Sequence, residues 1–258
     1  MGAVWENPAA VAVPGKYRWC LNMAVQYKRI LLKVSGEALS GEKGTGFDET
    51  TIASICAGIK AAYDLGAQIG IVVGGGNFWR GRSSGKMDRM DADKIGMLAT
   101  VMNCIYVSEI FRSVGMKTEI FTPFACGAMT KLFSKDEANA CFAEKKVAFF
   151  AGGTGHPYFS TDTTTVLRAI EIEAETILLA KAVDGVYDSD PKTNPNAVKY
   201  DEISIEEVVA KKLAAMDLTA SIMCMEQKMP MLVFGLNEEN SIIRAAKGEI
   251  DGTKVLVD

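Results

Sequence analysis

The sequence predicts an α/β protein, a three-layer αβα sandwich around a mainly parallel sheet. Apolar runs of strand length alternate along the chain with segments whose apolar residues recur at helical spacing. Such alternation is typical of a parallel sheet covered by helices on both faces. Hydrophobic residues make up 48% of the 258 residues, which is ample for the core of such a sandwich. We expect residues 27–258 to form one domain with two lobes, which meet within 180–199.

Residues 1–26 differ from the rest of the chain. They contain Pro8, Pro14 and two tryptophans, and they show no periodic pattern. The apolar piece within 9–13 is too short for the core of a signal peptide. We expect a disordered leader or an upstream mis-start, with Met23 as the native start.

The predicted strands are short runs of apolar residues. They cover 28–34, 69–73, 117–121, 147–151, 176–180, 231–234 and 253–257. The predicted helices lie between them and cover 49–65, 91–114, 135–144, 161–174, 204–213, 217–228 and 241–247. Asp48 is suited to cap the first of these helices. In the second we expect one apolar stripe to face inward, namely Ile95, Leu98, Met102, Ile105 and Ile110.

The first predicted strand contains a lysine, Lys33, within its apolar run. A buried ammonium group is costly unless an anionic group meets it. Ser35 and Gly36 follow directly, and a turn of small residues leaves backbone N–H groups free to approach an anion. Open α/β sheets bind ligands at the carboxyl ends of their strands. The stretch therefore predicts an anion site, and the alternative is a lysine that reaches out to water.

Three predicted strands end in glycine-containing turns, at 33–36, 74–77 and 152–155. If these strands are parallel neighbours, the turns share one edge and suit a large polyanion. The alternative is that turns in α/β proteins often contain glycine. The stretch 81–87 is one residue short of a Walker loop, and Tyr158 stands where a dinucleotide fingerprint has its last glycine. The sequence therefore indicates neither a P-loop enzyme nor an ordinary dinucleotide-binding protein.

Residues around these turns are candidates for the site. Arg80 follows the second turn closely enough to reach a phosphate. Asp93 is either an acid in the first turn of a helix or a hydrogen-bond acceptor for sugar hydroxyls. Asp162 either favours a helix dipole or holds the Lys33 amine, next to a helix that Ser160 or Thr161 caps. Tyr158 and Phe159 either stack on a base or pack, and we favour packing for Phe159.

Composition limits the function further. A net charge of -4 argues against general nucleic-acid binding, and no apolar run approaches the roughly 20 residues of a membrane helix. His156 is the single histidine, which argues against mechanisms and metal sites built on histidine. The six cysteines show no C-x-x-C spacing, so we expect reduced cysteines, several of them in the core, and a cytoplasmic protein.

Several longer motifs resemble a known family from Tyr27 to the C-terminus. They are YKRILLKVSGEAL at 27–39, GGGN at 74–77 with Arg80-Gly81, GMLATVMN at 96–103, TGHPYFSTD at 154–162, and VDGVY at 183–187 with Asp190-Pro191. With these motifs the chain resembles the bacterial UMP kinase (uridylate kinase) family of the amino-acid-kinase superfamily.

The resemblance implies an amino-acid-kinase-like fold with a phosphate-acceptor lobe and an ATP lobe. It implies phosphoryl transfer from ATP to UMP, in which Lys33, Arg80 and Asp162 are catalytic. The implied ATP-binding residues are Lys33, Ser35, Gly36, Gly76, Arg80, Lys181, Tyr187 and Asp190. The implied UMP-binding residues are Gly75, Asp93, Thr154, Gly155, His156, Pro157, Tyr158, Phe159, Ser160 and Thr161. Mg²⁺ would be bound through the ATP phosphates, without protein ligands.

The same resemblance implies a cytoplasmic homohexamer that is inhibited by UTP and activated by GTP. Two alternatives remain open. One is a sibling kinase that phosphorylates a carboxylate, such as an acetylglutamate or aspartate kinase. The other is a regulatory protein that senses UMP or UTP and acts through a partner.

Overall fold

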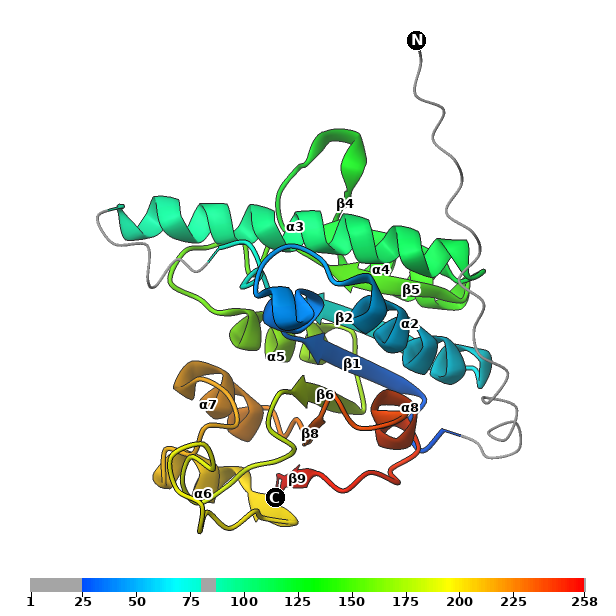
Figure 1. The fold of residues 1–258 in the computed structure, drawn as a ribbon. Helices are drawn as coiled ribbons and strands as arrows, with labels where there is room; N and C mark the ends of the chain where they lie inside the picture. The colour runs from blue at the N-terminus through cyan, green and yellow to red at the C-terminus, as the bar shows by residue number, and fades with distance from the viewer. Residues whose placement is uncertain (1–24, 80–86, 258) are drawn as a thin grey trace.

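The computed structural model describes residues 25–79 and 87–257, so the predicted leader lies almost wholly outside the described residues (Figure 1). Its strands form one sheet in the order β4-β3-β5-β2-β1-β6-β8-β9-β7. The strands are β1 (Arg29–Val34), β2 (Gln68–Val73), β3 (Lys117–Thr122), β4 (Lys131–Leu132), β5 (Lys146–Phe150), β6 (Thr176–Lys181), β7 (Glu202–Ser204), β8 (Met231–Gly235) and β9 (Thr253–Leu256). Every pairing is parallel except that of β8 with β9.

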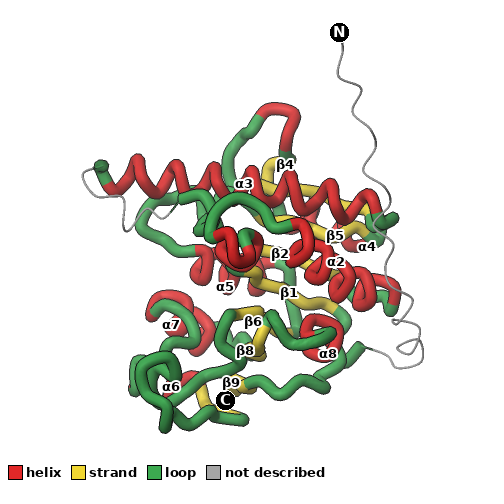
Figure 2. Tube along the Cα trace, in the orientation of Figure 1, coloured by secondary structure: helices red, strands yellow, loops and turns green. Residues whose placement is uncertain are grey.

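The helices cover both faces of this sheet, as the sequence predicted. They are α1 (Gly36–Leu39), α2 (Glu49–Asp64), α3 (Arg89–Ser113), α4 (Lys135–Ala143), α5 (Thr161–Glu171), α6 (Ile205–Ala210), α7 (Leu218–Glu226) and α8 (Ser241–Ala246). Single turns of 3-10 helix lie at Gly41–Lys43 and Gly127–Met129. The segment between β6 and β7 is almost entirely loop, as expected for 188–199 (Figure 2).

Alternation along the strands sorts the core into two halves. In β1, Ile30 and Leu32 pack in one cluster with α2, α3 and α8. Leu31 points the other way and packs with α4, α5, α6 and α7. Successive side chains of a strand point to opposite faces of a sheet, so this division is that of an αβα sandwich.

The three glycine-containing turns lie on one edge of the sheet. β5, β2 and β1 are neighbours and run parallel, with Val72 opposite both Phe150 and Lys33. Their carboxyl ends therefore meet, which confirms the arrangement expected from the sequence. Ser35 and Gly36, Gly74 to Asn77 and Gly152 to Gly155 follow these three ends.

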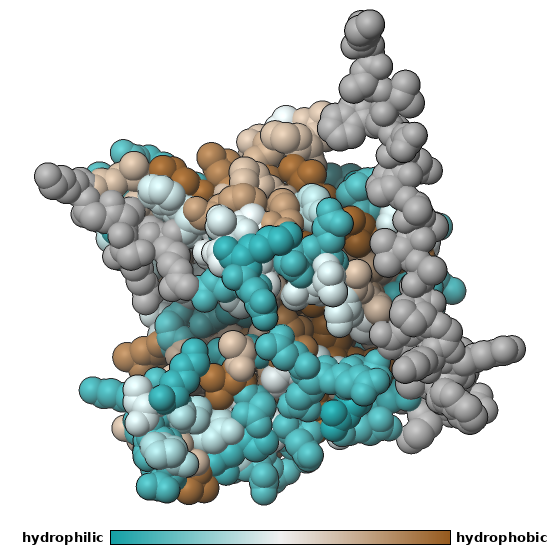
Figure 3. Space-filling view, viewed as in Figure 1, coloured by the Kyte–Doolittle hydropathy of each residue, from teal (hydrophilic) through white to brown (hydrophobic). Residues whose placement is uncertain are grey.

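Helix α3 contradicts one prediction. Four of the five residues in its predicted inward stripe are exposed: the exposed fraction is 53% for Leu98 and 48% for Met102, and Ile95 and Ile105 are exposed too. The fifth, Ile110, packs against the core as predicted. The buried face instead contains Cys104, Val107 and Phe111. The helix is apolar on two sides, and only one side can pack on the sheet. Figure 3 shows hydrophobic residues gathered on the surface in the region of α3.

Within the described part of the chain, α3 is the one helix long and apolar enough to span a membrane, and half of its apolar window is buried, as in a core helix.

Cys56, Cys104, Cys141 and Cys224 are buried and unpaired, as expected for reduced core residues. Burial raises the pKa of the Cys104 thiol to about 12.

Helix ends differ from the prediction by a few residues. The helices predicted over 161–174 and 204–213 end at Glu171 and Ala210. Just beyond these ends, Glu173 and Lys212 have positive φ angles of 56° and 52°. A left-handed residue ends a helix, and the usual glycine signal is missing at both positions. The short elements α1, β4 and β7 were not predicted.

Candidate active site at the glycine-turn edge

The centre of the site is an ion pair between two predicted residues. The Lys33 Nζ at the end of β1 lies 3.0 Å from Asp162 Oδ1 in the first turn of α5, and both side chains are mostly buried. The lysine thus meets a carboxylate rather than water. The ion pair holds the ammonium group in place beside the turns.

Ser160 sets the position of Asp162. Its Oγ accepts hydrogen bonds from the backbone N–H groups of Asp162 and Thr163, at 3.0 and 3.1 Å, and so caps α5. The same hydroxyl donates a hydrogen bond to Asp217, which in turn caps α7 by accepting from Ala220 N at 3.0 Å. Asp217 therefore connects α7 to the start of α5, a role that the sequence analysis missed.

The first two turns touch each other so closely that only glycine fits. A Cβ on Gly36 would lie 2.3 Å from the carbonyl oxygen of Gly74 and 2.7 Å from Gly76 N. A Cβ on Gly75 would lie 2.9 Å from the carbonyl oxygen of Gly96 in α3. These glycines are needed for close backbone approach, which brings the Ser35-Gly36 turn, the Gly74–Gly76 turn and α3 together.

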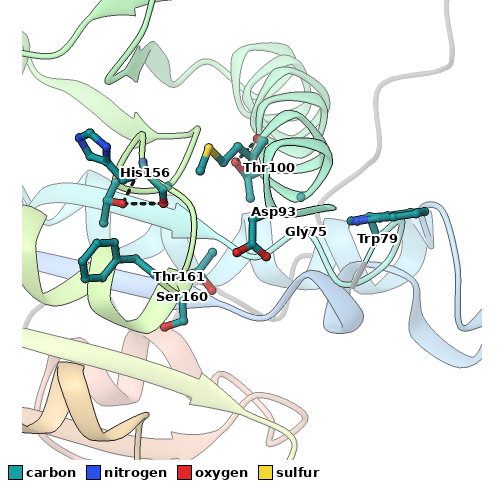
Figure 4. Close-up of a pocket in the computed structure, with 12 residues that line it drawn as sticks. Gly75, Trp79, Asp93, Thr100, His156, Ser160 and Thr161 are labelled. Carbon is teal, nitrogen blue, oxygen red and sulfur yellow. Dashed lines mark hydrogen bonds between the residues drawn. The ribbon is translucent and has the colours of Figure 1, made fainter. Parts of the chain in front are cut away.

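A cavity of about 140 Å³ lies beside these turns, between α3 and the segment 153–161 (Figure 4). Its lining includes seven of the predicted UMP-binding residues: Gly75, Asp93, Thr154, His156, Phe159, Ser160 and Thr161. Gly155, Pro157 and Tyr158 are not among its lining residues. The lining also includes residues that were not predicted, namely Trp79, Gly96, Met97, Thr100 and Gly153.

Asp93 joins the two walls of the cavity. Its Oδ2 accepts hydrogen bonds from Arg89 Nε and from the backbone N–H of Tyr158, both at 2.8 Å. The backbone of Tyr158 has a positive φ of 72°. Its ring and that of Phe159 are more than half exposed, so packing of Phe159 in the core, which we favoured, is wrong. The Phe159 ring lines the cavity, whereas the Arg89 guanidinium lies over the Tyr158 ring, 5.4 Å from its centroid.

Comparison with known proteins identifies the family of this chain. Residues 28–235 match the model of the Amino acid kinase family. The chain belongs to this family.

Solved structures of family members are similar over nearly the whole chain. The UMP kinase from Ureaplasma parvum is 33% identical, with 90% of this chain and 100% of that chain covered and a TM-score of 0.85. The UMP kinase from Bacillus anthracis is also 33% identical, with 90% and 97% covered and a TM-score of 0.86. The uridylate kinase from Archaeoglobus fulgidus is 26% identical, with 88% and 99% covered and a TM-score of 0.65.

In this amino acid kinase, Lys181 lies near the central ion pair. Its Nζ donates hydrogen bonds to the carbonyl oxygens of Ala214 and Ala215, in the segment that leads to Asp217. Burial lowers the pKa of Lys181, while nearby Asp162 raises it and nearby Lys33 lowers it further. A second partly buried cation therefore faces the Lys33–Asp162 pair.

The other predicted ATP-binding residues are held more loosely. Tyr187 Oη donates to Asp184 Oδ1 at 2.7 Å, and Asp190 Oδ1 accepts from Lys192 N at 2.9 Å. Asp190 is exposed. These contacts join residues close together in the chain. Arg80 lies outside the described residues.

A second cavity, of about 630 Å³, includes Ser35 and Ala182 in its lining. Glu37, Glu42 and Asp48 contribute to its lining. Carboxylates repel phosphate groups, so the surroundings of Lys33 suit an anion better than this acidic cavity does. Within the described ranges, no group of three or more acidic, histidine or cysteine side chains is arranged to hold a metal ion.

Proposed function

We propose that this amino acid kinase transfers the γ-phosphoryl group of Mg-ATP to UMP, giving UDP and ADP, as in pyrimidine nucleotide biosynthesis. The observation that carries the proposal is the Lys33–Asp162 pair, at 3.0 Å, beside the glycine turns and the cavity that Asp93 borders. The UMP kinase structures at 33% identity support this choice of acceptor.

The proposed reaction needs no general base, because the attacking phosphate oxygen of UMP is already anionic. The protein then contributes positioning and charge neutralisation for an in-line transfer without a covalent intermediate. Lys33 neutralises charge on the transferred group, and Asp162 holds the lysine amine in place. Arg80 is proposed to assist from the second turn. A mechanism of this kind suits a chain whose single histidine, His156, is exposed.

UMP is proposed to occupy the cavity between α3 and 153–161. Asp93 is proposed to accept hydrogen bonds from the ribose, and Gly75 with Thr154–Thr161 to surround the base and phosphate. Tyr158 and Phe159 offer two exposed rings that suit base stacking. These residues define the proposed acceptor lobe of the domain 27–258.

ATP is proposed to lie along the neighbouring strand ends, with its phosphates at Lys33, Ser35, Gly36 and Gly76. Its adenosine is proposed to lie along Lys181, Tyr187 and Asp190 in the ATP lobe. Mg²⁺ is carried in on the phosphates, and an ion bound in this way needs few protein ligands.

Self-association is proposed through the exposed apolar stripe of α3, formed by Ile95, Leu98, Met102 and Ile105. Contiguous apolar surface of this kind usually marks a contact with another protein. We propose a cytoplasmic homohexamer that UTP inhibits and GTP activates. Leu98→Glu should then reduce the molar mass found by light scattering, whereas Glu109→Gln, at an exposed position of the same helix, should not.

The test of the function is coupled ADP release with Mg-ATP and protein that starts at Met23. The acceptors are UMP, CMP, dUMP, acetylglutamate and aspartate. Turnover with UMP alone supports the proposal. Turnover with an acid acceptor would instead establish a carboxylate kinase. A folded protein that binds UMP or UTP without any turnover would establish a regulatory protein.

A further inference from the structure

Two buried asparagines face each other where the second glycine turn meets α3. Asn77 ends the turn and Asn103 lies in α3, and their exposed fractions are 2% and 0%. Asn77 Nδ2 donates to Asn103 Oδ1 at 3.0 Å, and Asn103 Nδ2 donates to Asn77 Oδ1 at 2.7 Å. Neither residue is part of the lining of the 140 Å³ cavity.

The second donor of each amide reaches a different segment of the backbone. Asn103 Nδ2 donates to the carbonyl oxygen of Gly74 at 2.7 Å, and Asn77 Nδ2 donates to that of Gly46 at 2.9 Å. The backbone carbonyl of Asn77 also accepts from Gly46 N at 3.1 Å and from Thr45 Oγ1 at 2.9 Å. The pair therefore joins α3, the glycine turn and the loop that leads from α1 to α2.

The bond to Gly74 has a consequence for the turn. A peptide unit is planar, so fixing the carbonyl of Gly74 also fixes the direction of the N–H of Gly75. Three consecutive glycines have the widest backbone freedom of any residues and no side chains to restrict it. Gly74 O is also the atom against which Gly36 packs. Its orientation thus sets how the two phosphate-facing turns meet.

Because both asparagines are buried, their side-chain amides must find hydrogen-bond partners within the protein. An amide buried without partners is costly, and here all four side-chain donors and both carbonyl oxygens have partners. A satisfied network in a low-dielectric interior is rigid and selects one arrangement. Replacing either asparagine by alanine would remove hydrogen bonds that hold this arrangement. Neither residue lines the cavity proposed for the substrate.

We propose that the Asn77–Asn103 pair is a positioning element for phosphoryl transfer. It holds the Gly74–Gly75 peptide in one orientation and fixes the glycine turn against Ser35-Gly36. The inference rests on the proposed function, because the two turns matter to catalysis only if phosphates meet there. Asn103 has the larger effect because it binds Gly74 directly.

The test compares Asn103→Ala, Asn77→Ala and Ser108→Ala. Ser108 is the matched control, since it is fully buried in the same helix and bonded to Thr118 Oγ1 at 2.8 Å, away from the turn. All three should lower the melting temperature. For Asn103→Ala we expect kcat at 25 °C to fall by about ten- to a hundredfold, because misplacing reacting groups by about 1 Å costs on that order. The KM values for UMP and ATP should change much less.

For Asn77→Ala we expect a smaller loss of kcat, since Asn103 still reaches Gly74, and for Ser108→Ala none. Equal kcat values in folded Asn103→Ala and Ser108→Ala would overturn the proposal. If Asn103→Ala does not fold, a wild-type kcat in Asn77→Ala would overturn it in the same way.

Hydrogen–deuterium exchange of residues 74–79 gives a second measurement that needs no turnover. Exchange there should be faster in Asn103→Ala than in Ser108→Ala, and equal exchange would overturn the proposal. If the wild-type protein turns over no acceptor, the proposed function fails, and this exchange comparison alone decides whether the pair holds the turn.

Discussion

The proposed acceptor side of the site and the loop proposed to contact adenosine are built differently. On the proposed acceptor side, Asp93 binds the backbone of Tyr158, 65 positions away in the chain, and Ser160 binds Asp217, 57 positions away. In the loop proposed to contact adenosine, Tyr187 binds Asp184 and Asp190 binds Lys192, each only two or three residues away, whereas Lys181, at the end of β6, binds the distant Ala214 and Ala215. Long-range contacts place acceptor residues to within hydrogen-bonding distance, whereas a loop with local contacts tolerates change. We therefore expect substitutions to matter more on the acceptor side.

The largest effect should come from Lys33→Ala. Removing the ammonium takes away the cation proposed to neutralise the transferred phosphoryl group and leaves Asp162 without its ion-pair partner. Turnover with UMP should fall by orders of magnitude, about a hundredfold or more, while the far-ultraviolet circular dichroism stays that of the wild type. Asp162→Ala should follow the same pattern. Near-wild-type turnover in folded Lys33→Ala would remove the basis of the proposed mechanism.

Gly36→Ala should rank second. Its Cβ would lie 2.3 Å from Gly74 O, a contact that only a backbone shift can relieve. Both turns would move, so we expect a lower melting temperature and a loss of kcat of about tenfold or more. Thermal melts and steady-state kinetics measure the two effects. Unchanged kcat would mean that the spacing of the turns is not critical.

Asp93→Ala should affect the acceptor alone. If its carboxylate binds the ribose and the Tyr158 loop, the KM for UMP should rise about tenfold, as for loss of a charged hydrogen bond, while the KM for ATP stays constant. Asp91→Ala is the control, because Asp91 lies in the same helical turn but is exposed and paired with Lys94. Equal effects of the two substitutions would contradict a specific role for Asp93.

The smallest effect should come from the adenosine side. Tyr187→Phe should change the KM for ATP by less than about threefold, because the hydroxyl bonds only Asp184, within the same loop. If Tyr187→Phe changed the KM for ATP by a larger factor than Asp93→Ala changes the KM for UMP, the expected order of the two sides would be reversed.

A pH titration tests the hydrogen bond between Tyr187 and Asp184 directly. The hydrogen bond to Asp184 raises the pKa of Tyr187 above its usual value of 10.0. Because the folded-state pKa is the higher one, the stabilisation is complete below about pH 10 and is lost as the pH rises through the folded-state pKa. Asp184→Asn should lower that pKa. The measurement is tyrosinate absorbance, taken as the difference between the protein and Tyr187→Phe in each background.

Much of the site's frame was predictable because its signals are local. Strand-length apolar runs followed by glycine located the ends of β1, β2 and β5. Asp48 marked the start of α2, where it accepts from Thr51 N at 2.9 Å. The pairing of Lys33 with Asp162 was one of two interpretations. The structure selects it by placing α5 beside β1.

Other features have no local signal. Most of the inward stripe expected on α3 is exposed, because periodicity finds an apolar face but does not tell what covers it. Asp217 and Asn103 lie within the helices predicted over 217–228 and 91–114 and were given no role in the site, yet both contact it through partners far away in the chain. The helices that end at Glu171 and Ala210 gave no glycine signal, because Glu173 and Lys212 take the left-handed position beyond their ends.

The sequence by itself therefore determined the order of strands and helices, the glycine turns and the chemistry of the candidate residues, since these depend on backbone preferences over a few positions. Only the tertiary structure decided which side of α3 packs, which residues line the cavity and how Asn77 and Asn103 hold the turn. Those features depend on side chains that meet across the core, and close packing between distant segments leaves no trace in local spacing.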